Sequence, residues 1–388
     1  MPRGPSRRGL VPPFLAMDML GAATAREAAG QSVIHLEVGQ PGTPAPQGVL
    51  DAARSALATD RIGYTDSLGI AALREAIARH YGDLYGVAVE PGEVIVTTGS
   101  SAGFHLIFIA AFEPGDRVAL ASPGYPAYRN ILSALGLEPV LIEAGAAANY
   151  QPSIELLEDC VGRTGNIAGL IVTSPANPTG AMIPAPELAR LAAWCRERDI
   201  RLVSDEIYHG ITYEAPGQTA RAFGKEIVVI NSFSKYYSMT GWRLGWMLAP
   251  RELARSVECL AQNFYVSPPT LSQLAALAAF GCRAELDGHV ARYRTNRDVL
   301  IAMLNEVGLT RYAPAEGAFY LFVDVSALTR DSEAFCRRML DEVGVATTPG
   351  RDFDPIRGDD WVRISFAGSI RDIAEAARRL KEWLPRAG

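Results

Sequence analysis

Short apolar runs alternate with longer segments of helical spacing in the middle of the chain. Short apolar runs rich in β-branched residues are typical of buried strands, and apolar positions three and four residues apart are typical of helices. The predicted strands are 93–97, 117–121, 139–142, 167–173, 201–204, 227–230 and 244–249. The predicted helices between them lie at about 101–112, 125–136, 153–161 and 186–198. This alternation predicts an α/β fold whose mostly parallel sheet is flanked by helices on both faces.

The segments on either side of this alternation follow other patterns. The sequence predicts a short strand at 33–38 and helices between 48 and 85 that are interrupted at 60–69. A long helical stretch at 268–308 leads into the last part of the chain. That part has an apolar run at 318–325, a helical pattern at 331–343 and a strand pattern at 361–366.

These patterns predict two domains. The large domain, 48–280, contains the mostly parallel sheet, and the smaller α+β domain consists of 1–47 together with 281–388. Residues 1–50 are rich in Gly and Pro and are expected to be irregular. Pro12, Pro13 and Asp18 interrupt the apolar patch near the N-terminus, so we expect a frayed arm there and no signal peptide.

Composition excludes several classes of function. The formal net charge is −6 and no Lys/Arg run is present, so we expect no binding to nucleic acid. No apolar stretch approaches the ~18 residues of a membrane span. The five cysteines are scattered without a Cys-x-x-Cys pair, which argues against a zinc site or a disulfide framework and fits reduced thiols in a cytoplasmic protein.

Unusual polar residues follow four of the predicted strands. In an open α/β sheet, ligands bind at the carboxyl ends of the strands. The segments at these ends are Gly99-Ser-Ser-Ala-Gly103, Asn177-Pro-Thr-Gly180, Asp205-Glu-Ile-Tyr208 and Ser232-Phe-Ser-Lys235. Each segment alone is compatible with an ordinary turn. Four of them at one edge of a sheet indicate a single ligand site.

The chemistry of these side chains suggests the ligand. The 99–103 turn lies at a predicted helix N-terminus, where free backbone N–H groups bind phosphate. Lys235 carries an amine that forms a Schiff base with an aldehyde. Asp205 ends a buried strand, where an unpaired carboxylate is costly and requires a cationic partner such as a protonated pyridine nitrogen. A phosphate, an aldehyde and a pyridine together describe pyridoxal 5′-phosphate (PLP).

From Gly39 to Arg363 the chain resembles the class I/II aminotransferases, which are fold type I, aspartate-aminotransferase-like PLP enzymes. The motifs that carry the resemblance are Asn177-Pro-Thr-Gly, Asp205-Glu-Ile-Tyr208, Ser232-Phe-Ser-Lys235 and Gly241-Trp-Arg243. The resemblance implies PLP as cofactor. It also implies ping-pong transfer of an amino group from an amino acid to a 2-oxo acid.

The resemblance implies a role for each matching residue. Lys235 is the lysine that bonds the cofactor and moves the proton, and Asp205 keeps the pyridine nitrogen protonated. Tyr208 and Asn177 bind the 3′-oxygen of the ring, and Tyr125 stacks on it. The residues implied to hold the phosphate are Ser100, Ser101, Ala102, Ser232, Ser234 and Arg243.

Three further positions complete the implied site. Arg363 resembles the arginine that grips the substrate α-carboxylate, with Asn177 and the backbone of Gly39 assisting. Tyr64 resembles a tyrosine that reaches the phosphate of the neighbouring subunit, which implies a homodimer. No metal is implied at the site.

Other interpretations of the same residues remain open. Lys235 taken alone fits a solvated loop lysine, Tyr125 and Tyr208 fit core tyrosines, and Arg363 fits a solvated arginine on a strand. A PLP lyase or synthase on the same scaffold shares all of the cofactor residues. Its products distinguish it, because a lyase releases ammonia without needing an acceptor oxo acid.

Two motifs match other enzyme classes. Gly99-x-Ser101-x-Gly103 satisfies the nucleophile motif of hydrolases, but such an enzyme needs a late histidine, and the last one is His289. Ser232-x-x-Lys235 satisfies the motif of penicillin-interactive enzymes, yet no Lys-Thr-Gly follows it.

The substrate is only partly indicated. In the bacterial aspartate-type branch of the family, a lysine commonly occupies the position of Ser101 and a tryptophan that of Tyr125. Their absence favours a neutral or aromatic donor, with 2-oxoglutarate or pyruvate as acceptor.

Overall fold

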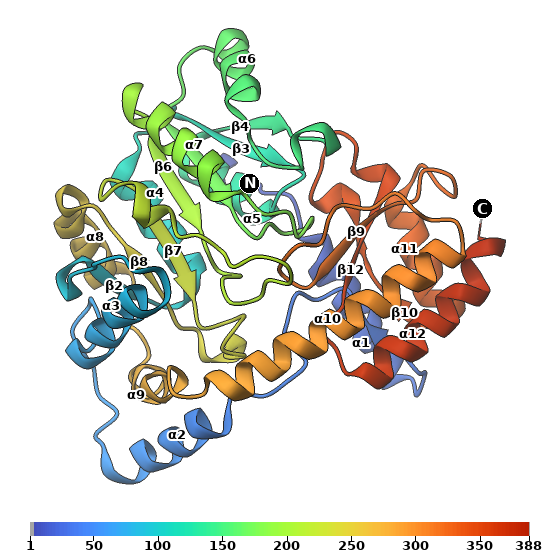
Figure 1. Cartoon of the computed structure of the whole chain (residues 1–388), viewed down its shortest axis with the longest axis horizontal. Coiled ribbons are helices and arrows are strands. Elements are labelled where there is room, and N and C mark those ends of the chain that lie inside the picture. The colour runs from blue at the N-terminus through green and yellow to red at the C-terminus, as the bar shows by residue number, and fades with distance from the viewer. Residues whose placement is uncertain (1–3, 388) are drawn as a thin grey trace.

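A seven-stranded sheet forms the centre of the computed structural model, which describes residues 4–387 (Figure 1). Its strand order is β2-β8-β7-β6-β5-β3-β4. The strands are β2 (Val94–Thr97), β3 (Arg117–Ser122), β4 (Glu138–Glu143), β5 (Gly169–Thr173), β6 (Arg201–Asp205), β7 (Val228–Ser232) and β8 (Gly245–Leu248). Within the described residues, only β8 runs antiparallel to its neighbours in this sheet, β2 and β7. The expected mostly parallel α/β sheet is therefore confirmed.

Helices cover both faces of this sheet. They are α3 (Ala71–Tyr85), α4 (Gly99–Ala111), α5 (Pro126–Leu135), α6 (Ile154–Thr164), α7 (Ala185–Glu197), α8 (Arg251–Phe264) and α9 (Thr270–Ala279), and α2 (Gln47–Thr59) packs against α9. Successive strand residues point to opposite faces. On β2, Val96 packs into one hydrophobic cluster and Ile95 into another. This two-sided burial explains why the strands are uninterrupted apolar runs.

A second group of elements packs around a three-stranded antiparallel sheet of order β11-β12-β9. These strands are β9 (Tyr320–Asp324), β11 (Thr348–Pro349) and β12 (Trp361–Ser365). A parallel pair, β1 (Ile34–His35) and β10 (Val345–Ala346), joins the N-terminal segment to it. The surrounding helices are α10 (Arg283–Glu306), α11 (Ser332–Val343) and α12 (Ile370–Trp383). Figure 1 shows α10 running from beside α9 toward these elements.

The expectation that residues 1–50 are irregular is wrong, because Leu15–Ala28 form a helix, α1. Its buried residues, Ala16, Met19 and Ala23, have helical spacing. Met19 and Ala23 pack into the same hydrophobic cluster as β9, β10 and β12. The prolines that suggest an irregular arm lie before the helix begins, and Asp18 is exposed.

Other boundaries also differ from the sequence prediction. The strand expected at 33–38 is only Ile34–His35. The helical stretch expected at 268–308 is divided into α9 and α10 by Phe280–Cys282. Among residues 4–387, no helix is both long enough and apolar enough to cross a lipid bilayer.

Candidate active site

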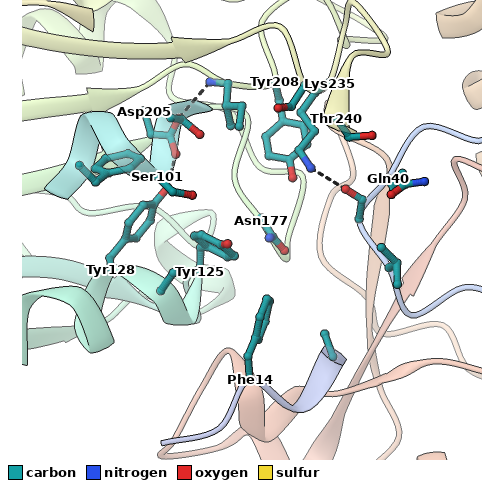
Figure 2. Close-up of a pocket in the computed structure, with 18 of the residues that line it drawn as sticks. Phe14, Gln40, Ser101, Tyr125, Tyr128, Asn177, Asp205, Tyr208, Lys235 and Thr240 are labelled. Atoms are coloured by element: carbon teal, nitrogen blue, oxygen red, sulfur yellow. Dashed lines mark hydrogen bonds between the residues drawn. The ribbon is translucent and has the colours of Figure 1, made fainter. Parts of the chain in front are cut away.

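A cavity of about 280 Å³ lies at the carboxyl ends of the central strands (Figure 2). The segments that line it follow β5, β6 and β7, and the first turn of α4 closes one side. The structure brings together eleven of the residues predicted from the sequence. They are Gly39, Ser100, Ser101, Tyr125, Asn177, Asp205, Tyr208, Ser234, Lys235, Arg243 and Arg363.

Three predicted residues do not line this cavity. Tyr64 lies on the loop between α2 and α3 and is 86% exposed. Ala102 faces a neighbouring surface hollow. Ser232 is buried behind Ser234, and its hydroxyl donates to the Leu244 carbonyl at 3.1 Å. A contact between Ser232 and a ligand is therefore indirect, through the 2.9 Å hydrogen bond between the two serine hydroxyls.

Lys235 lies in the loop after β7 and is partly buried. Its Nζ donates a hydrogen bond to the Gly39 carbonyl oxygen at 2.5 Å (Figure 2). Burial, together with the positive charges of Arg363 and Arg243, lowers the pKa of the Lys235 amine to about 8. A larger fraction of neutral amine is thus present near neutral pH than for a solvated lysine. The alternative of a solvated loop lysine is wrong.

Asp205 is the last residue of β6 and is 3% exposed. Its carboxylate accepts hydrogen bonds from the Tyr128 hydroxyl and, at 3.0 Å, from the Ile207 N–H. Burial raises the pKa of Asp205 to about 6, although both hydrogen bonds and Lys235 act in the opposite direction. Within residues 4–387, Asp205 forms no ion pair. The site therefore holds a buried carboxylate without a cationic partner.

The N-terminus of α4 is arranged to receive an anion. The first N–H groups of a helix have no partner within the helix, and Thr98 does not cap them with its side chain. Gly99 has φ +76°, and a Cβ there would lie only 3.0 Å from the Arg243 Cζ, so the glycine admits the guanidinium beside the helix end. The Ser234 hydroxyl lines the same cavity.

Arg363 lies on β12 and is 2% exposed, so the interpretation as a solvated strand arginine is wrong. Its guanidinium packs against the rings of Tyr320 and Phe353, each with its centroid 4.5 Å away. Nη1 donates to the Asn177 Oδ1 at 3.0 Å, and Nη2 donates to the Glu37 carbonyl. Its Nε is buried without a hydrogen-bond partner among the described residues. A fixed cation with an unused donor suits a carboxylate ligand.

Tyr125 and Tyr208 both line the cavity. Tyr125 immediately precedes α5, and its hydroxyl pKa is raised to about 12 chiefly by burial. The Tyr208 hydroxyl shares a 2.7 Å hydrogen bond with that of Tyr320. Both tyrosines thus present part of their surface to a ligand and are not solely core residues.

Sequence reasoning missed several residues of the cavity. Tyr128 contacts Asp205 from the first turn of α5, and Tyr320 lines the cavity from β9. Phe14, the residue before α1, and Met17, in the first turn of α1, also line the cavity. The spacing of Tyr125 and Tyr128 is a usable signal, since residues three apart share a helix face. The apolar patch near the N-terminus gives no direct indication of its position.

The hydrolase interpretation lacks its catalytic partner. In the part of the chain that is described, no histidine forms a hydrogen bond to Ser101, and the nearest histidine in sequence, His105, bonds to the Tyr265 hydroxyl instead. Across residues 4–387, no cluster of three or more His, Cys, Asp or Glu residues is placed to hold a metal ion.

The residues present fit PLP. The free N-terminus of α4 with Arg243 matches the phosphate, the amine of Lys235 matches the aldehyde, and the cation-free carboxylate of Asp205 matches a protonated ring nitrogen. Fold and site together define an enzyme of the fold type I class.

The comparisons with known proteins identify the family. The chain belongs to the aminotransferase class I and II family, which matches residues 31–380. It is 51% identical to the valine–pyruvate aminotransferase of Mycobacterium tuberculosis, over 97% of this chain and 98% of that protein. The Thermus thermophilus aspartate/prephenate aminotransferase is 34% identical, over 99% of this chain and 100% of that protein. The protein is therefore an aminotransferase.

Solved structures agree with this family assignment. A crystal structure of an aminotransferase from M. tuberculosis superposes with a TM-score of 0.96 at 50% identity, covering 99% of this chain and 100% of that chain. The structure of the T. thermophilus aspartate aminotransferase with maleate superposes with a TM-score of 0.92 at 33% identity, covering 98% of this chain and 99% of that chain.

Proposed function

We propose that this aminotransferase binds PLP and transfers the amino group of an L-amino acid to a 2-oxo acid by a ping-pong mechanism. One observation carries the proposal. A single cavity brings together the amine of Lys235, the buried carboxylate of Asp205, the open N-terminus of α4 and the guanidinium of Arg363. These groups come from separate segments of the chain, and their convergence on one cavity supports a common ligand site.

The residues that would hold the cofactor follow from their chemistry. Arg243, Ser234 and the N–H groups of Ser100 and Ser101 would bind the phosphate, with Ser232 supporting Ser234. Asp205 would bind the ring nitrogen, and Tyr125 would stack on the ring. When bound, PLP supplies an aldehyde that bonds amines and a ring that withdraws electrons from the substrate Cα.

Lys235 has the properties of a proton carrier. Its pKa of about 8 lets the Nζ exist in both protonation states near neutral pH. The neutral Nζ would take the proton from the substrate Cα, and the resulting ammonium would deliver it to the carbon that carried the aldehyde of PLP. The Gly39 carbonyl, 2.5 Å from Nζ, holds the amine inside the cavity. The amino group stays on the enzyme after the first oxo acid leaves, which is the basis of ping-pong kinetics.

Arg363 would orient the substrate by its α-carboxylate. The guanidinium is already fixed by Asn177 and Glu37, so little side-chain freedom is lost when a substrate binds. Tyr208 and Asn177 would bind the 3′-oxygen of the ring, and the Gly39 backbone would assist at the carboxylate. A charge-assisted hydrogen bond from the unused Nε to the carboxylate would hold the substrate Cα at a fixed place in the site.

The donor is proposed to be neutral or aromatic. Ser101 stands where a lysine would meet a second carboxylate in aspartate-type relatives, and the relative at 51% identity is named for valine and pyruvate. Pyruvate or 2-oxoglutarate is the proposed acceptor.

The proposal also includes a homodimer in which Tyr64 reaches the neighbouring site. Its 86% exposure leaves the ring free to contact a second copy. We further propose that residues 48–280 act as the large domain, and 1–47 with 281–388 as the small one. Two hydrophobic clusters support this division, because one consists mostly of residues from 48–280 and the other mostly of residues from 1–47 and 281–388, with Leu286 and Tyr208 among the exceptions. All five cysteines are free thiols, which supports a cytoplasmic location.

A panel of amino acids tested against both acceptors examines this proposal. Each donor is first added alone to the PLP-loaded enzyme while the absorbance of the cofactor is followed. We expect a stoichiometric spectral change with neutral donors and parallel double-reciprocal lines at several acceptor concentrations. Release of ammonia without an acceptor would contradict the transferase mechanism, and the absence of any cofactor absorbance would contradict PLP binding.

A further inference from the structure

The start of α1 forms part of the wall of the active-site cavity. Phe14, the residue before the helix, lines the cavity together with Ala16 and Met17 from its first turn. Figure 2 shows Phe14 rising toward the cavity from the side opposite Lys235. Phe14 meets Tyr125 edge to face, with 5.9 Å between ring centroids. The N-terminal segment thus approaches the ring proposed to stack on the cofactor.

Two further apolar side chains line the cavity besides Phe14 and Met17. Phe104 from α4 and Ile131 from α5 line the same cavity. The charged residues among the described lining are limited to Asp205, Lys235, Arg243 and Arg363. Each of these four already has a place in the proposed function. No cation of the described lining residues remains for a second carboxylate on the substrate.

A buried carboxylate fixes this wall. Asp352 is 2% exposed, and its oxygens accept the N–H of Leu15 at 3.3 Å and of Ala16 at 3.1 Å. Phe14 offers no capping side chain, so Asp352 supplies the helix cap from 336 residues away in sequence. The Asp352 carbonyl also accepts a 2.6 Å hydrogen bond from Arg129 of α5. One residue therefore connects the helix of Phe14 to the helix of Ile131.

From these contacts we propose that Phe14 and Met17 determine specificity by packing on the donor's side chain, and that Asp352 is a positioning residue for them. The selected donors are neutral amino acids with bulky apolar side chains. This inference rests on the proposed function and identifies its substrate class. Apolar contact with the wall favours such donors over alanine, whose methyl group offers much less apolar surface, and the lack of a free cation disfavours aspartate.

Two substitutions test the wall directly. Phe14→Ala and Met17→Ala should each lower kcat/KM for leucine and phenylalanine by about tenfold or more, because pocket contacts with apolar groups discriminate by that order. The value for alanine should change by less than about twofold. Val11→Ala is the matched control, since Val11 is 44% exposed in the same segment and does not line the cavity.

Substitution of Asp352 tests the positioning role. Asp352→Ala should raise KM for bulky donors more than it lowers kcat, while the cofactor absorbance stays normal. Asp352→Asn keeps one acceptor for the helix N–H groups, so its KM for bulky donors should lie between those of Asp352→Ala and the wild type. A merely structural role would reduce activity with all donors alike and would not be rescued selectively by Asn.

Binding without turnover supplies an independent measurement. Calorimetry on the PLP-loaded enzyme should show that 4-methylpentanoate binds more tightly than succinate, and that Phe14→Ala removes this preference. The inference would be overturned if Phe14→Ala and Met17→Ala lowered kcat/KM equally for all donors. It would also be overturned if the wild-type enzyme preferred aspartate and succinate. Those outcomes are distinct from failure of the proposed function, in which no donor reacts and no cofactor absorbance is seen.

Discussion

The Nζ of Lys235 and the carbonyl oxygen of Gly39 lie 2.5 Å apart, although 196 residues separate them in sequence. Lys235 follows a strand of the seven-stranded sheet, and Gly39 lies just after β1. The hydrogen bond keeps the amine in the cavity, where burial lowers its pKa to about 8. Lys235 is therefore the amine most available to an aldehyde.

Borohydride reduction of the PLP-loaded protein should attach the cofactor permanently to Lys235. Peptide mapping of the reduced protein checks this, and the chain contains only two other lysines, Lys225 and Lys381, as internal controls. Lys235→Ala should remove the label and the turnover. Label on Lys225 or Lys381, or undiminished turnover of the variant, would show that Lys235 is not the reactive amine.

Asp205→Ala should lower the rate of the first half-reaction by about 10³-fold or more. Loss of a preorganised electrostatic partner costs several kcal/mol of barrier, and about 1.4 kcal/mol corresponds to a factor of ten. Stopped-flow absorbance with one donor measures this step directly. Asp159→Ala is a suitable control because Asp159 is an exposed helix carboxylate that does not line the cavity. A loss of less than tenfold would argue against the electrostatic role.

The cofactor-free protein should be stabilised by Asp205→Asn in a pH-dependent way. Burial raises the pKa of Asp205 in the folded protein to about 6, above its ordinary value of 3.8. The folded state then binds more protons than the unfolded state between these values, so wild-type stability falls as pH rises through that window and stays lower above it. Two pKa units correspond to about 3 kcal/mol.

Chemical denaturation of both cofactor-free proteins at several pH values measures this difference. The free energy of unfolding of Asp205→Asn should exceed that of wild type above pH ~6, with the gap closing toward pH ~4. Adding PLP should make wild type the more stable protein again, because the carboxylate of Asp205 pairs with the protonated ring nitrogen and the amide of the variant does not. A gap that is constant with pH would mean that Asp205 does not titrate in this range.

Arg363→Lys should weaken donor binding while leaving the cofactor in place. A lysine cannot reproduce the planar, multi-donor contacts of the guanidinium, and charge-assisted hydrogen bonds contribute about 1.5–3 kcal/mol each. We expect kcat/KM for α-amino acids to fall by about 10- to 100-fold. Reactivity toward an amine without an α-carboxylate should be unchanged, and an equal loss for that amine would contradict the role in carboxylate binding.

Mixing two inactive variants tests the proposed role of Tyr64. In a dimer of a Tyr64→Ala subunit with a Lys235→Ala subunit, one site regains both residues if Tyr64 reaches across. PLP affinity and turnover should therefore rise after subunit exchange toward half of the wild-type value per dimer. Leu57→Ala, at another exposed residue (63%) of the same region, is the control partner for Lys235→Ala. No complementation would place Tyr64 outside the neighbouring site.

The sequence by itself determined the alternation of strands and helices and the groups at the strand ends. Both are local properties, because a short apolar run followed by Asp205 or by Ser232–Lys235 indicates a buried strand and its polar end without any distant contact. The class of chemistry follows from these residues because an amine, a carboxylate and a phosphate-binding turn each combine with a limited set of ligand groups.

Only the tertiary structure decided what surrounds those groups. The Arg363 contact with the Glu37 carbonyl spans 326 residues, and the Asp352 cap of α1 spans 336. Period-2 alternation gives the face on which Arg363 lies but not whether another element covers that face. For the same reason, helical spacing in α1 does not reveal that Phe14 borders the active site. Burial and partner choice depend on how distant segments pack, and that information is not local to any stretch of the sequence.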